Sequence, residues 1–311
     1  MINITQEQVM QNWGVENTET PLVSIRCITY NQESYIAQAL DGFLMQKTTF
    51  PFEVIVHDDA STDKTSIIIR EYESKFPKII KPIYETENLY SKHDGSLGRI
   101  VNDACKGKYI AICEGDDYWI DSNKLQLQVD FLETHKNYSM CFHKAEIKKE
   151  IDIDCGLKCE TIEDRDYTAT EVFKEWIVPT ASICVKKDVF FIPIKHEERM
   201  LNGDIFLVER AAHCGKIRGF SNVMSVYRLQ KNGVTYDKNL SKKRILAYPD
   251  HYKTISENFP KIRKYYIHKF LIYSYIGIYR HVDKKPRILL KAFFVSPCIF
   301  ISMLLKKLIF R

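Results

Sequence analysis

The sequence predicts a protein of the α/β class, with a mixed, mostly parallel sheet flanked by helices and a basic, apolar helical extension at the C-terminus. Two observations predict the sheet: apolar runs alternate with helical patterns over the first half of the chain, and polar clusters follow several of those runs. The distribution of charge along the chain predicts the C-terminal extension. Residues 251–311 hold 13 Lys and Arg against two acidic residues, so this segment carries +11 and the rest of the chain −6.

The alternation of strands and helices begins at residue 22. Buried strands are predicted at 22–30, 52–57, 79–84 and 109–113. Helices are predicted at 33–45, after a cap at Ser61-Thr62-Asp63, near 98–105, and after a cap at Asp121 or Ser122. Right-handed crossovers connect such units, so we expect a mostly parallel sheet.

Three of the predicted strands end in polar clusters, which are Thr29-Tyr30-Asn31, His57-Asp58-Asp59 and Glu114-Gly115-Asp116-Asp117. Ligands of parallel sheets gather at the carboxyl ends of the strands. The three clusters are therefore expected to meet at one edge of the sheet.

The segment Cys113-Glu114-Gly115-Asp116-Asp117-Tyr118-Trp119 places three carboxylates within four positions, where they repel one another unless something offsets the charge. One interpretation is an acidic turn stabilised by the macrodipole of the following helix. That helix has its own predicted cap, which leaves these acids unassigned. Since Mg²⁺ and Mn²⁺ bind one or two carboxylates together with substrate phosphates, a cation held here would bridge the protein to a diphosphate. Gly115 would let the backbone approach the ligand.

The residues after the second strand have two interpretations of equal weight. A turn that caps the next helix explains Ser61, Thr62 and Asp63. It does not explain the two carboxylates of Asp58 and Asp59, and a carboxylate at a strand end can accept the imide N–H of a uracil.

Two later positions are ambiguous on the residues alone. Asp204 begins an apolar helical stretch, where a helix cap is favoured over a general base for an acceptor hydroxyl. Arg228 and Lys231 follow a predicted strand, where they can neutralise a leaving diphosphate or be solvated surface charges.

The sequence lacks the signature motifs of several classes of protein. The sequence contains no GxxxxGK[ST] loop, no GxGxxG after a strand and no Gly-x-Ser-x-Gly elbow. Nine cysteines without a CxxC pair indicate neither a disulfide framework nor a zinc site, and they favour a reducing cytosol. The N-terminal residues lack the basic and apolar regions of a signal peptide.

Taken together, these motifs resemble family 2 glycosyltransferases of the GT-A fold, of the type found in bacterial surface-polysaccharide assembly. The resemblance covers roughly residues 20–235, through the order and spacing of Pro21-Leu22-Val23-Ser24-Ile25, Ile28-Thr29-Tyr30-Asn31, Asp58-Asp59-Ala60-Ser61-Thr62-Asp63, Gly107-Lys108-Tyr109-Ile110-Ala111, Glu114-Gly115-Asp116-Asp117-Tyr118-Trp119, Gly203-Asp204 and Met224-Ser225-Val226-Tyr227-Arg228.

The resemblance implies an inverting transferase that uses a nucleotide-diphosphate sugar, most often a UDP-sugar, with Mn²⁺ or Mg²⁺. It implies that the donor is bound by Thr29, Tyr30, Asn31, Asp58, Asp59, Glu114, Gly115, Asp116 and Arg228. The family's Asp-x-Asp metal motif falls on Glu114-Gly115-Asp116, with Asp116 and Asp117 as the metal ligands, and its catalytic base on Asp204. Gln230 stands where relatives often have a metal-binding histidine.

Residues 288–305 are mostly apolar and are flanked by basic residues, which are Lys284, Lys285, Arg287, Lys306, Lys307 and Arg311. Lys291 and Pro297 interrupt the run, which suits a segment lying on an anionic membrane better than one crossing it. The alternative is a helix packed on the protein. We expect a cytoplasmic enzyme that is peripheral on the inner face of the cell membrane, with a glycan or lipid-linked acceptor by family analogy.

The expected domains are an N-terminal extension (1–20), a glycosyltransferase domain (21–236, with a nucleotide-binding half at 21–147 and an acceptor half at 148–236) and a membrane-associating region (237–311). The alternatives are a nucleotidyl- or phosphotransferase with the same acidic site, a signalling receiver domain and a non-catalytic nucleotide-sugar binding module. No nucleic-acid partner is expected.

Overall fold

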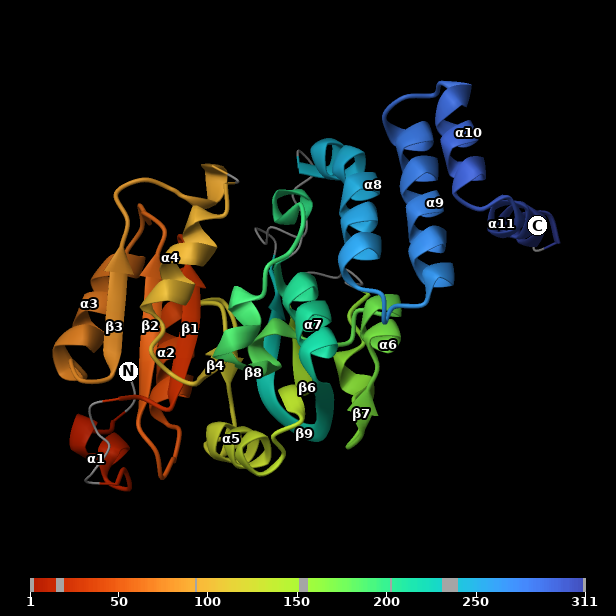
Figure 1. Cartoon of the computed structure of the whole chain (residues 1–311). Coiled ribbons are helices and arrows are strands. Elements are labelled where there is room, and N and C mark those ends of the chain that lie inside the picture. The colour runs from red at the N-terminus through yellow and green to blue at the C-terminus, as the bar shows by residue number, and fades with distance from the viewer. Residues whose placement is uncertain are drawn as a thin grey trace. The chain divides into compact units, whose positions relative to one another are not determined.

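The computed structural model describes residues 3–14, 20–92, 94–150, 156–201, 203–230 and 240–309 (Figure 1). The chain forms two compact units. The first comprises Met1–Thr168, Glu175–Ile192 and Arg210–Gln230, and the second comprises Ala169–Lys174, Pro193–Glu209 and Lys231–Arg311. Because this division follows compactness alone, the domain limits expected from the sequence, at residues 20, 147 and 236, stay predictions.

A mixed sheet runs through the first unit, and its order in the described residues is β3-β2-β1-β4-β8-β6-β9-β5, with β7 paired to β9. The strands β3, β2, β1 and β4 are parallel to one another, and β8 joins β4 antiparallel. The predicted α/β class is therefore confirmed. The strands span Val23–Thr29 (β1), Phe52–Asp58 (β2), Ile80–Tyr84 (β3), Tyr109–Ile112 (β4), Tyr118–Trp119 (β5), Tyr138–Lys149 (β6), Asp166–Tyr167 (β7), Cys184–Lys186 (β8) and Lys216–Leu229 (β9).

Apart from the helix at Gln6–Met10, which was not predicted, the helices of the first unit lie within a few residues of their predicted positions. The cap predicted at Asp121 or Ser122 lies one or two residues before the observed N-cap position, Asn123, which makes no side-chain cap bond. The Asp121 carboxylate accepts the N–H of Asn123 at 2.8 Å. The helices are Gln6–Met10 (α1), Ile36–Leu44 (α2), Thr65–Lys75 (α3), Ser96–Ala104 (α4) and Lys124–Thr134 (α5), with short 3₁₀ turns at Tyr90–Lys92, Cys159–Thr161, Thr180–Ser182 and Lys187–Phe191.

Helix α2 packs closely against β5 and thereby fixes one end of the acidic segment. Its fully buried side chains recur at helical spacing and form one face, which consists of Ile36, Ala39, Leu40, Phe43 and Leu44. The rings of Phe43 and Trp119 lie 4.8 Å apart in an edge-to-face arrangement. A Cβ atom on Gly42 would lie 2.9 Å from the backbone N and O atoms of Trp119, so a glycine is required at this approach.

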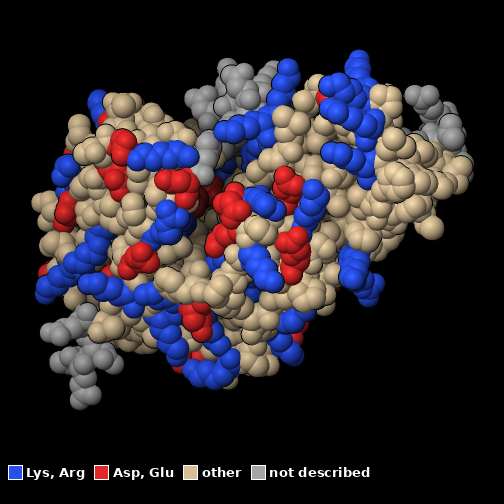
Figure 2. All heavy atoms as spheres, turned by 45° about the horizontal axis from the view of Figure 1, so that its top comes forward, with Lys and Arg blue, Asp and Glu red and all other residues tan. Residues whose placement is uncertain are grey.

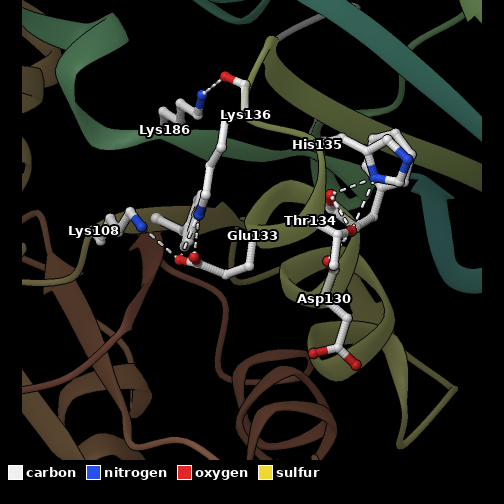
Figure 3. Close-up of polar contacts among 9 residues, drawn as sticks. Lys108, Asp130, Glu133, Thr134, His135, Lys136 and Lys186 are labelled. Atoms are coloured by element: carbon white, nitrogen blue, oxygen red, sulfur yellow. Dashed lines mark hydrogen bonds and ion pairs between the residues drawn. The ribbon is translucent and has the colours of Figure 1, made fainter.

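A cluster of charged side chains ties α5 to the edge of the sheet where β4 begins (Figure 3). Glu133 accepts a hydrogen bond from Lys108 at 2.6 Å and another from Lys136, and these bonds lower the pKa of Glu133 to about 2. A cavity of about 410 Å³ lies in the same region and is lined by Lys108, Lys186, Lys187, Asp188 and Phe191. Since Tyr109 is the first residue of β4, this cluster lies at the opposite end of the strand from the acidic segment.

The second unit is helical in its described part, as the sequence predicts. No single helix in the described ranges is long and apolar enough to cross a membrane, whereas α10 and α11 together pass that test with a bend of 113° between them. Helix α9 packs against both α8 and α10. The helices are Ala169–Lys174 (α6), Gly203–Cys214 (α7, which begins in this unit), Leu240–Asn258 (α8), Lys264–His281 (α9), Pro286–Val295 (α10) and Pro297–Ile309 (α11), with a 3₁₀ turn at Glu197–Arg199.

Candidate active site

The polar clusters that follow β1, β2 and β4 meet at one edge of the sheet. The register of the parallel strands β1 and β2 pairs Thr29 with Asp58, the last residue of each. We call Cys113–Asp117, which follows β4, the acidic loop. Within it, the N–H of Gly115 donates to the carbonyl of Ile28 at 3.0 Å. The expected convergence at the carboxyl ends of the strands is therefore observed.

The loops after β1 and β2 are joined by side-chain hydrogen bonds. Asn31 has a left-handed backbone with φ of 50°, its N–H donates to Ser61 Oγ at 2.9 Å, and its Oδ1 accepts the N–H of Thr62 at 2.8 Å. Thr29 Oγ1 donates to Gln32 Oε1 at 2.8 Å. Tyr30, by contrast, is 45% exposed, so its ring is accessible to a ligand at this edge. Asn31 therefore shapes the loop, and Tyr30 offers a surface.

Asp58 and Asp59 are adjacent but differ in their surroundings. Both carboxylate oxygens of Asp59 accept backbone N–H groups, from Leu89 at 2.7 Å and from Tyr90 at 3.0 Å. Both residues are buried, with Asp58 at 3% and Asp59 at 1% exposure. In Asp58, Oδ1 accepts the N–H of Ser61 at 3.1 Å. Asp59 thus holds the loop after β3, and Asp58 is the better placed of the two to accept a hydrogen bond from a base.

Glu114 turns back onto β1. Its Oε2 accepts the N–H of Ile28 at 3.1 Å, and its Oε1 lies 3.6 Å from the Arg26 guanidinium. The sequence resemblance assigns Glu114 a contact with the donor, and the structure shows it fixing the acidic loop to β1. Its donor contact stays a prediction.

Gly115 is required by the close approach of the acidic loop to β1. A Cβ atom here would lie 2.8 Å from both Cβ and Oγ1 of Thr29 and 2.5 Å from Gln32 Oε1. The sequence interpretation placed a ligand against this glycine, whereas the structure places the end of β1 there.

Gly115→Ala is expected to lower the free energy of unfolding by about 1–3 kcal/mol, because overpacking against Thr29 forces a backbone shift. Urea unfolding of the purified protein measures this. The matched control is Gly98→Ala in α4, where a Cβ atom would meet nothing within 4 Å and helix propensity predicts a gain of about 0.5–1 kcal/mol. Equal effects of the two substitutions would show that Gly115 does not serve this packing role.

Asp116 and Asp117 have different partners on the chain. Asp117 is 3% exposed, and its Oδ1 accepts the N–H of Arg228 at 2.8 Å, which ties the acidic loop to β9. Burial, together with the neighbouring Asp116 carboxylate, raises the pKa of Asp117 well above its usual range. Asp116 is half-buried, and its Oδ2 accepts from Gln230 Nε2 at 2.5 Å. Burial also raises the pKa of Asp116. Asp116 is thus the more accessible carboxylate of the pair.

Arg228 clamps the acidic loop between α2 and β9. Its guanidinium lies 4.9 Å from the ring centroid of Tyr35 and 4.4 Å from that of Tyr118. It donates hydrogen bonds to the carbonyl of Asp116 and to Gln38 Oε1. Arg228 therefore supports Asp116 directly, whereas its contact with a diphosphate stays a prediction. Lys231, the other predicted phosphate ligand, lies outside the described residues.

The site fits a cation that binds together with a substrate. In the part of the chain that the structure describes, no three His, Cys, Asp or Glu residues are arranged to hold a metal ion. Asp116 supplies a carboxylate at the sheet edge, to which Gln230 Nε2 donates a hydrogen bond. Since Mg²⁺ commonly takes one or two carboxylates with substrate phosphates and water, this carboxylate suits a diphosphate-bound cation. The site does not resemble a metal centre in which the protein supplies all the ligands.

Asp204 belongs to the second compact unit. It is the second residue of α7, and its Oδ1 accepts the N–H of Ile205 at 2.8 Å. Its role as the catalytic base stays a prediction.

Several side chains around the acidic loop are not apparent from the sequence. Gln32, Tyr35 and Gln38 reach it from the loop before α2 and from that helix, through Thr29 and Arg228. Their spacing along the chain is that of an ordinary amphipathic helix, so local pattern carries no signal for them. Gln230 was visible only as a departure from the family's histidine.

The fold and the sheet edge define the class of protein as the GT-A glycosyltransferases. S. aureus TarS 1–349 in complex with UDP-GlcNAc superposes with a TM-score of 0.65 at 15% identity, over 89% of this chain and 82% of that one. The mannosyltransferase PcManGT from Pyrobaculum calidifontis in complex with GDP-Man and Mn²⁺ gives a TM-score of 0.50 at 17% identity, over 93% and 80%. The model of Glycosyl transferase family 2 matches residues 24–179. The chain belongs to this family.

The chain is also similar in sequence to several other proteins, two of which are named as glycosyltransferases. An uncharacterized protein of Mycobacterium tuberculosis is 36% identical over 212 residues, which cover 68% of this chain and 60% of that protein. An uncharacterized glycosyltransferase of Methanocaldococcus jannaschii is 25% identical over 293 residues, covering 89% and 94%. The Escherichia coli UDP-Glc:alpha-D-GlcNAc-diphosphoundecaprenol beta-1,3-glucosyltransferase WfaP is 35% identical over 115 residues, covering 37% and 43%. The chain thus spans 60% of the length of the mycobacterial relative that it matches.

Proposed function

We propose that the protein is an inverting glycosyltransferase that requires Mn²⁺ or Mg²⁺ and moves a sugar from a UDP-sugar to a hydroxyl group of a glycan or lipid-linked acceptor. The observation that carries this proposal is the sheet edge, where Asp58 and the acidic loop with Asp116 lie on either side of the end of β1. The similar structures support it, since TarS was solved with UDP-GlcNAc and PcManGT with GDP-Man and Mn²⁺.

In this proposal, the residues after β1 and β2 bind the nucleoside. Asp58 accepts the imide N–H of the uracil as a charge-assisted hydrogen bond, and the exposed ring of Tyr30 stacks on the base. Asp116 would hold the cation, and Arg228 keeps Asp116 in place. When bound, the cation supplies positive charge that stabilises the leaving diphosphate.

The transfer itself is a single displacement. The acceptor oxygen forms a bond to the anomeric carbon of the sugar while the bond from that carbon to the diphosphate oxygen breaks on the opposite face, which inverts the configuration. Asp204 takes the proton of the acceptor hydroxyl as general base. Its match to the family's Gly-Asp motif supports this role.

We further propose that the acceptor is lipid-linked and that the reaction takes place at the inner face of the cell membrane, with the protein in the cytoplasm. WfaP, which is similar to this chain over 37% of its length, is a glucosyltransferase for a diphosphoundecaprenol-linked acceptor. The net charge of +11 on residues 251–311 also favours an anionic surface.

A screen of nucleotide sugars tests this function. The full-length protein is incubated with UDP-, GDP- and other nucleotide-linked sugars, with Mn²⁺, with Mg²⁺ or with a chelator, and nucleotide release is measured. We expect release from a UDP-sugar only with a divalent cation. Equal affinity for UDP with and without Mn²⁺, and no release from any donor, would support a non-catalytic binding module instead.

A further inference from the structure

The last two helices expose apolar side chains on their outer faces. On α10, the exposed residues recur at helical spacing, and among them Leu290 is 55% and Phe294 75% exposed. The opposite face of α10 is buried through Ile288 and Ala292. On α11, Ile301 is 47% and Leu305 52% exposed. Apolar side chains this exposed, on two consecutive helices, indicate an interaction surface.

Basic side chains share this surface. Arg287 and Lys291 are exposed on the same face of α10 as Leu290 and Phe294. No acidic residue follows Asp283, whereas seven basic residues do, which are Lys284, Lys285, Arg287, Lys291, Lys306, Lys307 and Arg311. Figure 2 shows tan surface bordered by blue Lys and Arg toward the right of the view, the side on which Figure 1 places α10 and α11. The partner of this surface must therefore be apolar and negatively charged.

We propose that the outer faces of α10 and α11 form a membrane-docking surface that lies in the interface of a bilayer containing anionic phospholipids. Leu290, Phe294 and the exposed residues of α11 enter the boundary of the acyl chains, and Arg287 and Lys291 contact the lipid phosphates. This inference rests on the proposed function for its location and names the residues and the lipid chemistry that hold the protein there.

Charge favours a membrane over a second copy of the chain. Two copies meeting through this face would bring their Arg287 and Lys291 side chains together without acidic partners from the same segment, which is unfavourable. The basic residues also favour helices that lie on the membrane over helices that cross it. On α10, these basic residues share the exposed face with the apolar side chains. A headgroup region accommodates such a mixed face, and a hydrocarbon core does not.

Vesicle sedimentation tests the proposal with the full-length protein. Binding is measured to phosphatidylcholine vesicles and to phosphatidylcholine–phosphatidylglycerol vesicles, at low and high salt. We expect binding only to the anionic vesicles, weakened by salt because screening shortens the range of the attraction. The double variant Leu290→Ser/Phe294→Ser should lower the partition coefficient about tenfold or more, and Arg287→Gln/Lys291→Gln should lower the preference for anionic lipid roughly thirtyfold.

The matched control is Phe191→Ser, which removes an aromatic side chain that is 52% exposed in the first unit and should leave vesicle binding unchanged. Circular dichroism of each variant checks the fold. Equal binding of wild type and the double variant would overturn the proposal, as would a dimer lost in that variant or retention on membranes after alkaline extraction. Nucleotide release in detergent should be the same for all variants, so failure of docking and failure of the proposed function are distinguishable.

Discussion

Asp116→Asn is expected to lower turnover roughly a hundredfold or more while the protein stays folded. Asparagine keeps the size of the side chain and an oxygen that can still accept the hydrogen bond from Gln230 Nε2. It removes the negative charge with which Asp116 would bind the cation of the donor diphosphate. The measurement is nucleotide release over a range of Mn²⁺ concentrations, together with thermal unfolding to compare stability.

Asp130→Asn provides the matched control for this prediction. Asp130 is an exposed residue of α5 in the same unit (Figure 3). Its Oδ1 accepts a hydrogen bond from Gln126 at 2.9 Å. Its substitution should leave turnover unchanged. If Asp116→Asn turned over as fast as wild type at every Mn²⁺ concentration, the cation would not bind through the acidic loop, and the metal part of the proposed function would be wrong.

The position of the site could be predicted from the sequence because it depends on strand order alone. Polar residues that follow apolar runs in a parallel sheet lie at one edge, whatever the details of the loops. The pairing of Thr29 with Asp58, and the bond from Gly115 to Ile28, follow from that regularity.

The division of work among the carboxylates could not be predicted. Glu114, Asp59 and Asp117 look alike in the sequence, and each accepts a backbone N–H from a residue far along the chain. Those donors are Ile28, Leu89 with Tyr90, and Arg228. The partner of a carboxylate depends on tertiary contacts that no local pattern reports, so a cluster of acids predicts a site better than it predicts each member's role.

The exact first residue of a helix is also difficult to predict from the sequence. Asp121, Ser122 and Asn123 are all good N-cap residues, and the sequence gives no reason to prefer the third. The carboxylate of Asp121 accepts the N–H of Asn123 two residues on, as an N-cap side chain does, and the regular helix α5 begins at Lys124. A run of polar residues therefore predicts the helix start only to within a few positions.

Asp204→Asn is expected to lower the rate of sugar transfer by about 10²–10⁴-fold, because an amide cannot take the proton of the acceptor hydroxyl. Affinity for the donor should stay within about twofold of wild type, since a general base acts on the acceptor. The measurements are transfer rate at saturating donor and acceptor, and calorimetric titration of UDP in the presence of Mn²⁺. Glu198→Gln is the matched control, because Glu198 is a carboxylate of the same unit that is 69% exposed.

The response to added Mn²⁺ separates the two carboxylates. A weakened metal ligand is compensated in part by more metal, so the activity of Asp116→Asn should rise with Mn²⁺ concentration beyond the point where wild type saturates. A missing base is not replaced by metal, so Asp204→Asn should stay slow at every concentration. Wild-type transfer by Asp204→Asn would remove this residue from the base role. Loss of UDP binding in the same variant would mean that Asp204 holds the donor, and the deprotonation step would need another residue.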